Sequence, residues 1–286
     1  MKKIAFLPLF LFFAFCKREA KIKLPNQEPR LVVTCFISPQ NPNITAVVRT
    51  SIQKFSGSYI NYTKKGTTES DIINARVEIT DGVKTVVIPF DTTLASYNID
   101  ATSLPIVSGK SYSLAVSTPD GKKVTGVTTV PSGNFELEYS KPSFTKNTEI
   151  EVNFSFNVLI KDRPNELNYI AGYYNIFSVT SGTNPFIYIP NDEPYLFEAD
   201  EDIVRESYSG TVNYYNFSPD TILTIPVTLK TLNCSKEFYL FNKTSRAAVY
   251  NDGNPFGEPV LVYSNINGGF GCFGAYTERT DSFLAK

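Results

Sequence analysis

The chain contains no histidine. This absence excludes Ser-His-Asp and Cys-His nucleophile activation, because both use an imidazole as the general base. It also removes the commonest ligand of transition metals. Hydrolysis by paired carboxylates or by a Ser-Lys pair stays open, but no spacing in the sequence singles out such a pair. We therefore expect no enzyme activity and no cofactor.

Charge of either sign is scarce and balanced. The 27 Lys and Arg residues are matched by 28 Asp and Glu residues, which gives a net charge of −1. A nucleic-acid partner is discounted, because proteins that bind nucleic acids carry a basic surplus. Tryptophan is absent, yet 17 Tyr and 22 Phe residues are present. Together with Thr, Val and Ile they dominate the long runs, and this composition favours β-strands.

Cysteine is rare as well, with four residues in the chain. Cys16 lies near the start, and no two of Cys35, Cys234 and Cys272 are close enough in sequence for a zinc knuckle. A disulfide between Cys234 and Cys272 would stabilise the fold by about 3–4 kcal/mol in the chain-entropy model. The alternative is three buried thiols that act as small hydrophobic side chains. We prefer this alternative, since an odd number leaves one thiol unpaired in any case.

Long hydrophobic runs are almost missing, and the exception stands at the start of the chain. Every residue of 4–15 except Pro8 is apolar, and Lys2 and Lys3 precede this run. It is too short for a bilayer, which needs about 20 apolar residues, but it is typical of a cleaved secretory signal over residues 1–15. Cys16 stands where the cleavage site belongs, which indicates lipidation of its thiol.

The bulky Phe15 departs from the small residue that usually precedes a lipidated cysteine, and an ordinary signal with a buried cysteine is the alternative. The polar residues 17–19 directly after Cys16 favour lipidation. Two or more acyl chains, palmitate among them, would give stable anchoring, and residues 16–30 would form a polar tether. By bacterial sorting rules, Arg18 in place of Asp favours the outer membrane. The sequence leaves open whether the protein faces the periplasm or the cell surface.

Residues 31–132 predict an immunoglobulin-like β-sandwich, because seven short strands with turn signals between them have the number and spacing of that fold. We place the strands at 31–38, 44–52, 75–80, 84–90, 96–99, 111–118 and 122–129. Asp81-Gly82 and Pro119-Asp120-Gly121 are turn signals, since proline presets φ and glycine supplies a positive φ. Leu104-Pro105 followed by Tyr112 is similar to the tyrosine corner of fibronectin-type domains.

Residues 133–286 predict a larger antiparallel β-sheet or barrel domain with one helix. Apolar and polar residues alternate over 149–161, which indicates a strand with one buried and one wet face. Further strands are expected at 167–179, 208–217, 222–230, 259–264 and 270–277. A helix is expected at 235–250, because Ser235 can cap its start and apolar residues then recur at helical spacing.

Two groups of residues in this second half are candidates for contact with a ligand or partner. Tyr214 and Tyr215 could stack on sugars or on a partner's side chains, although adjacent residues of a strand point to opposite faces. Gly268, Gly269 and Phe270 belong to a tight glycine-rich connection between strands. It is no nucleotide loop, because neither Lys-Ser/Thr nor a helix follows.

An acidic stretch at 191–206 is the one weak candidate for a metal site. It contains Asp200, Glu201 and Asp202, and oxygen-rich loops can bind Ca²⁺. No Asp-x-Asp-x-Asp-Gly order is present, so a solvated loop is the preferred interpretation.

Two blocks near the C-terminus carry a family resemblance. They read Asn-Pro-Phe-Gly-Glu-Pro-Val at 254–260 and Tyr-Ser-Asn-Ile-Asn-Gly-Gly-Phe-Gly-Cys-Phe-Gly-Ala at 263–275. The chain thereby resembles a Bacteroidota family of outer-membrane lipoproteins, the domain-of-unknown-function family DUF4249. Members are often found alongside TonB-dependent transporters, so the resemblance implies an accessory of such a β-barrel. The family has no established activity, so the resemblance implies no catalytic residue.

Three functions follow from these patterns. The first is a non-enzymatic outer-membrane lipoprotein that binds a β-barrel transporter or its cargo. The second is a glycan- or peptide-binding surface module that uses Tyr214 and Tyr215. The third, which the sequence supports least, is a carboxylate-based hydrolase.

Overall fold

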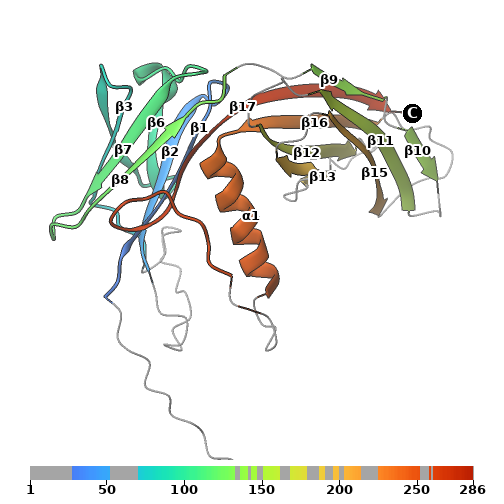
Figure 1. The fold of residues 1–286 in the computed structure, drawn as a ribbon. Coiled ribbons are helices and arrows are strands. Elements are labelled where there is room, and N and C mark those ends of the chain that lie inside the picture. Colours follow the sequence, from blue (N-terminus) through green and yellow to red (C-terminus); the bar gives the residue numbers. More distant parts are fainter. Residues whose placement is uncertain are drawn as a thin grey trace, which may run out of the picture.

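The protein is mainly β, with one α-helix in the described residues (Figure 1). The computed structural model describes residues 28–51, 70–132, 136–140, 143–146, 151–161, 168–178, 187–190, 196–199, 203–213, 225–251, 258 and 260–285. The expectation of a mainly β chain with one helix is therefore confirmed. No helix among these residues is long and apolar enough to cross a membrane.

The first half forms two sheets that pack face to face. One sheet contains β1 (Leu31–Ile37), β2 (Asn43–Thr50), β6 (Ser96–Asp100) and β5 (Phe90–Asp91), and the other contains β4 (Thr85–Ile88), β3 (Arg76–Thr80), β7 (Ser111–Ser117) and β8 (Lys123–Thr129). A short 3-10 turn, η1 (Ala101–Ser103), follows β6. Six of the seven predicted strands are confirmed, and the one predicted at 84–90 is divided at Pro89 into β4, which pairs with β3, and β5, which pairs with β6. Buried and less buried residues alternate along β1 and β7, which turns one face of each sheet toward a common core.

Both predicted turns are confirmed, and side chains fix them. Asp81 Oδ1 accepts hydrogen bonds from the backbone N–H of Val83 (3.0 Å) and Lys84 (2.7 Å). Gly82 and Gly121 both have φ of 88°, which a residue with a side chain rarely adopts. Lys110 Nζ lies 2.6 Å from Asp81 Oδ2 and ties the β3–β4 turn to the start of β7. This hydrogen bond, with the two backbone donors, holds the pKa of Asp81 below its usual range.

Tyr112 closes the connection between β6 and β7. Its hydroxyl donates to the carbonyl oxygen of Pro105 (2.8 Å) and accepts from the backbone N–H of Val107 (2.9 Å). The ring is buried, and burial raises the pKa of the phenol. The tyrosine-corner contact expected between Tyr112 and the Leu104-Pro105 stretch is thus present.

The second half contributes the remaining strands. One sheet contains β9 (Glu136–Tyr139), β10 (Ser143–Lys146), β11 (Glu151–Lys161) and β15 (Ile203–Asn213). The other strands are β12 (Tyr169–Ser178), β13 (Ile187–Pro190), β14 (Leu196–Ala199), β16 (Ile225–Cys234) and β17 (Phe270–Ala285). In the described residues these strands form open sheets, so the barrel alternative is wrong. The sheet order ends at β13, which pairs with β12 alone, and β17 continues the sheet into the first half by pairing its residues 270–275 with β1.

Three expectations for the second half are corrected. Residues 260–264 form no strand; the segment lies against the helix instead, where the N–H of Tyr263 donates to Thr244 Oγ1 (2.8 Å). The strand expected at 208–217 begins at Ile203, since it pairs with the whole length of β11. The stretch 191–206 is only partly a loop, because β14 and the first residues of β15 lie within it and pair with β12 and β11.

The long strand β17 joins the two halves into one nine-stranded sheet (Figure 1). Its first residues run parallel to β1, with Val32 opposite Phe270 and Ile37 opposite Ala275. Its later residues run antiparallel to β16. Three residues from this end of the chain, Ile266, Phe273 and Ala275, belong to the core cluster of the first half. A cut at residue 132 would therefore remove part of the sandwich core.

Glycine permits the close approach of β17 to β1. A Cβ atom at Gly271, where φ is +110°, would lie 2.0 Å from the carbonyl oxygen of Val33. A Cβ atom at Gly269 would lie 2.5 Å from the carbonyl oxygen of Leu31. Both distances are far below van der Waals contact, so the glycines of the predicted C-terminal signature have a packing role.

The helix α1 (Lys236–Asn251) covers the face of the nine-stranded sheet opposite the sandwich core. It confirms the expected helix, and Ser235 is its N-cap, with its Oγ accepting from the N–H of Phe238 (3.3 Å). Phe238 packs edge-on against Phe36, with ring centroids 4.8 Å apart. Gly274 lets the helix approach, since a Cβ atom there would lie 2.9 Å from the Cβ of Phe238.

Candidate binding sites

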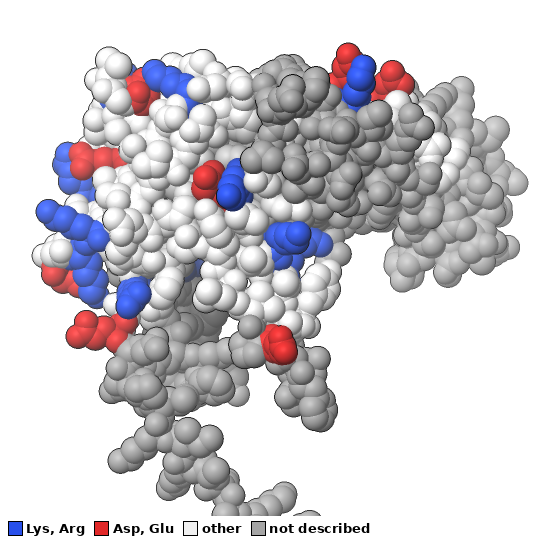
Figure 2. Space-filling model, in the orientation of Figure 1, with Lys and Arg blue, Asp and Glu red and all other residues white. Residues whose placement is uncertain are grey.

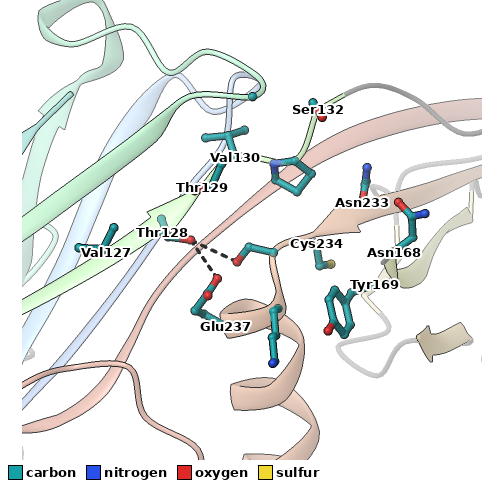
Figure 3. A pocket seen from close by; sticks show the side chains of 14 residues that line it. Val127, Thr128, Thr129, Val130, Ser132, Asn168, Tyr169, Asn233, Cys234 and Glu237 are labelled. Carbon is teal, nitrogen blue, oxygen red and sulfur yellow. Dashed lines mark hydrogen bonds between the residues drawn. The ribbon is translucent and has the colours of Figure 1, made fainter. Parts of the chain in front are cut away.

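A pocket of about 630 Å³ opens where the two halves meet, and we call it the junction pocket (Figure 3). It lies between the end of β8, the start of β12, the end of β16 and the first turn of α1. Its lining residues are Gly109, Val127, Thr128, Thr129, Val130, Pro131, Ser132, Asn168, Tyr169, Asn233, Cys234, Ser235, Lys236 and Glu237. The volume falls in the range of small-molecule sites.

A cluster of hydroxyl groups and one carboxylate forms one wall of the junction pocket. Thr128 Oγ1 lies 3.3 Å from both Ser235 Oγ and Glu237 Oε2, and it can donate its proton to only one of them at a time (Figure 3). Ser235 Oγ also accepts from the backbone N–H of Phe238 and of Ala275 (3.1 Å). Ser235 thereby links α1 to both β17 and β8. Its lone pairs are engaged by N–H donors, which suits a structural connection better than a nucleophile.

The other wall of the junction pocket presents amide and aromatic groups. The side chains of Asn168 and Asn233 are buried, and Tyr169 packs against Tyr239 with ring centroids 5.1 Å apart. Lys236 is exposed at the rim. Amides and hydroxyls around an aromatic ring can hydrogen-bond a small polar ligand.

A second pocket, of about 810 Å³, lies at the end of the molecule where β1 begins, and we call it the Arg30 pocket. Its lining residues are Glu28, Pro29, Arg30, Leu31, Lys122, Lys123, Gly268 and Phe270. The Arg30 guanidinium stacks over the Phe270 ring at 5.3 Å from its centroid. Three cationic side chains and one carboxylate therefore face the same space.

The structure places part of the predicted contact group in the Arg30 pocket. Gly268 and Phe270 line it, and Gly269 lies against Leu31. The glycines are needed for packing, because a Cβ atom at Gly268 would lie 2.8 Å from the carbonyl oxygen of Lys123. Phe270 remains half exposed and is the one member whose side chain is available to a ligand.

Other predicted site residues lie outside the described part of the chain. These are Cys16, Asp200, Glu201, Asp202, Tyr214 and Tyr215. Among the residues that are described, no group of three Cys, Asp or Glu side chains could hold a metal ion.

The remaining cysteines are buried free thiols. The disulfide considered between Cys234 and Cys272 is not formed, because Cys234 lies opposite Tyr276 in the β16–β17 ladder. Four residues of strand, about 13 Å, separate that position from Cys272, and a disulfide requires Cα atoms within about 7 Å. Burial raises the pKa of Cys35 to about 12 and raises the pKa of the other two thiols as well. None of the three is a thiolate at neutral pH.

Sequence reasoning missed the cations of the Arg30 pocket. Arg30 lies at the end of the expected tether, and Lys122 and Lys123 follow an expected turn, but nothing in either segment indicates that they meet. Their proximity depends on residues 267–270, which pair with β8 at Asn267 and with β1 at Phe270. A lysine pair beside a tight turn was the only local signal.

The family model described as "Domain of unknown function (DUF4249)" matches residues 17–282. No curated protein matches the chain.

Proposed function

We propose a function from one established premise: the chain belongs to the DUF4249 family of domains of unknown function. In this proposal the protein is anchored by lipid to the outer membrane. Its task is binding, without catalysis, as an accessory of a TonB-dependent β-barrel transporter. The partner comes from the family resemblance, and the anchor comes from the residues around Cys16.

The position of the family match carries this proposal. The match begins at residue 17, directly behind Cys16, and leaves out the apolar run that precedes it. This division is the one expected when residues 1–15 are a signal and Cys16 is the first residue of the mature protein. An acylated Cys16 would then be joined to the folded part through residues 17–27.

The chemistry of the described side chains supports binding over catalysis. Ser235 Oγ is occupied by backbone donors, and the described thiols are buried with raised pKa values. The chain has no histidine that could activate either kind of group.

We further propose that the first half is an immunoglobulin-like sandwich. The strand orders β1-β2-β6 and β4-β3-β7-β8 on facing sheets support this assignment, since they divide the strands as such folds do. The hydrogen bonds of Tyr112 to Pro105 and Val107 are those of a tyrosine corner. The parallel strand β17 beside β1 would then be an addition to this fold.

The anchor and the partner can be tested in one membrane preparation. Cells that express the wild type, Cys16→Ser or Cys35→Ala are fed a palmitate analogue, and the protein is recovered with its cross-linked neighbours. We expect label and a cross-linked β-barrel transporter for the wild type and for Cys35→Ala, and neither for Cys16→Ser. An unlabelled wild type would overturn the anchor, and a labelled protein without a transporter would overturn the partner.

A further inference from the structure

We propose that the end of the molecule at which β1 begins rests on a membrane surface, with the Arg30 pocket holding phosphate groups of lipid headgroups. The inference rests on the proposed function, because Cys16 must carry the anchor. It adds a lipid-binding site and an orientation that the anchor alone does not provide.

The cations of the Arg30 pocket are available for an anion. Arg30, Lys122 and Lys123 are exposed, and within the described ranges neither Arg30 nor Lys123 forms an ion pair. Lys122 Nζ lies 3.3 Å from Asp120 Oδ2, but both side chains are about half exposed, which makes this a weak pair. Glu28 is the single carboxylate in the lining. A phosphate entering the pocket would therefore meet more positive than negative charge.

Phe270 prepares one of these cations for binding. Its ring lies under the Arg30 guanidinium, with 5.3 Å between Cζ and the ring centroid, and such a cation–π contact uses none of the guanidinium's hydrogen-bond donors. A planar guanidinium binds phosphate oxygens in pairs. The attraction for phosphate has to come from the local arrangement of these cations. Figure 2 shows positive and negative side chains interleaved over the described face, and the chain's net charge is −1.

Exposed apolar side chains lie at the same end of the molecule and distinguish a lipid surface from free phosphate. In Figure 1, α1 runs toward the end at which β1 begins. Val249 in its last turn is 73% exposed, and Leu261 in the segment that returns along the helix is 89% exposed. Free phosphate would leave these side chains in water, whereas the interfacial region of a bilayer would cover them.

The path of the chain places this end near its own anchor. Residues 17–27 separate Cys16 from Glu28, and when extended they can reach about 40 Å. The lipid surface is thus always within reach of the Arg30 pocket. Docking costs little additional translational freedom, because the anchor has already confined the protein to the membrane.

The experiment places a polarity-sensitive fluorophore on one introduced cysteine of the full acylated chain in phosphatidylglycerol-containing vesicles. The native described thiols are buried and would not compete. Leu261→Cys reports the proposed contact. Val83→Cys is the control, because Val83 is 92% exposed in the β3–β4 turn and lies at the other end of the sandwich from the β7–β8 turn. We expect a blue-shifted, brighter emission for Leu261→Cys alone.

Charge variants then test the pocket. Lys123→Gln should lower the ratio of docked to undocked label about five-fold, and a second replacement at Arg30 should lower it about five-fold again. Lys84→Gln, an exposed lysine at the opposite end, should leave the ratio unchanged. Raising the salt concentration should also lower the ratio of docked to undocked label for the wild type, because salt screens the attraction between the cations and the lipid phosphates.

The outcomes separate this inference from the anchor. Protein that fails to float with the vesicles contradicts the proposed function. Protein that floats but gives identical emission at Leu261→Cys and Val83→Cys overturns the inference and leaves the anchor standing. Binding of inorganic phosphate that depends on Lys123, with no change of emission in vesicles, overturns it in favour of a soluble anion.

Discussion

At Gly271 a single hydrogen atom in place of a side chain allows β17 to lie beside β1. Any larger residue meets two independent obstacles: the φ of Gly271 is +110°, and a Cβ atom would lie only 2.0 Å from the carbonyl oxygen of Val33. Gly121 has a similar positive φ but open space around it. The two glycines therefore separate the cost of backbone conformation from the cost of crowding.

We predict that Gly121→Ala lowers the free energy of unfolding by about 1–2 kcal/mol, the cost of a left-handed conformation. Gly271→Ala should lower it by more than about 3 kcal/mol, because overpacking adds to that cost. Urea titrations followed by circular dichroism would measure both. Similar losses for the two variants would show that β17 does not approach β1 as described.

Asp81 gives a second prediction at this scale. Asp81→Asn keeps an oxygen for the turn but removes the charge that faces Lys110, whose hydrogen bond lowers the pKa of Asp81. A lowered pKa means that ionised Asp81 stabilises the fold above about pH 4, and that this contribution is lost as the pH falls through the lowered pKa. The difference in Tm between wild type and variant should be largest at neutral pH and should shrink below about pH 4. A difference that grows on acidification would contradict this.

Among the elements, α1 depends on the residue before it. Ser235 caps the helix and also accepts from the N–H of Ala275 in β17. We predict that Ser235→Ala lowers the free energy of unfolding by about 1–2 kcal/mol. Ser235→Thr, which keeps a hydroxyl cap, should lose less. Equal losses in denaturant titrations would mean that the cap contributes nothing of its own.

The sequence predicts strands best where their hydrogen-bond partners are close in the chain, and it fails for some segments whose partners are distant. The hairpins around Gly82 and Gly121 are local, so their turn residues and alternating strands are visible in the sequence, and the structure has them. The segment 260–264 has the composition of a strand, but it forms no strand, and the N–H of Tyr263 donates to the Thr244 side chain of α1. The polar residues of β17 beyond Ala275 show no apolar alternation and are extended because β16 pairs with them.

Across the whole molecule, the feature hidden from the sequence is the return of the chain's end to its beginning. The strands β1 and β17 are adjacent and parallel although more than two hundred positions separate them. The same return assembles the Arg30 pocket from three distant segments. A local reading predicts a division at residue 132, whereas the nine-stranded sheet runs through both halves.

The lipid anchor at Cys16 is tested most directly by mass spectrometry of the N-terminal peptide from the membrane fraction. We predict that this peptide begins at Cys16 and carries the mass of a diacylglyceryl group with a further acyl chain. Release of the protein from the membrane fraction should require a detergent. An N-terminus at any other residue, or an unmodified Cys16, would contradict the anchor, and the proposed orientation on the membrane would fall with it.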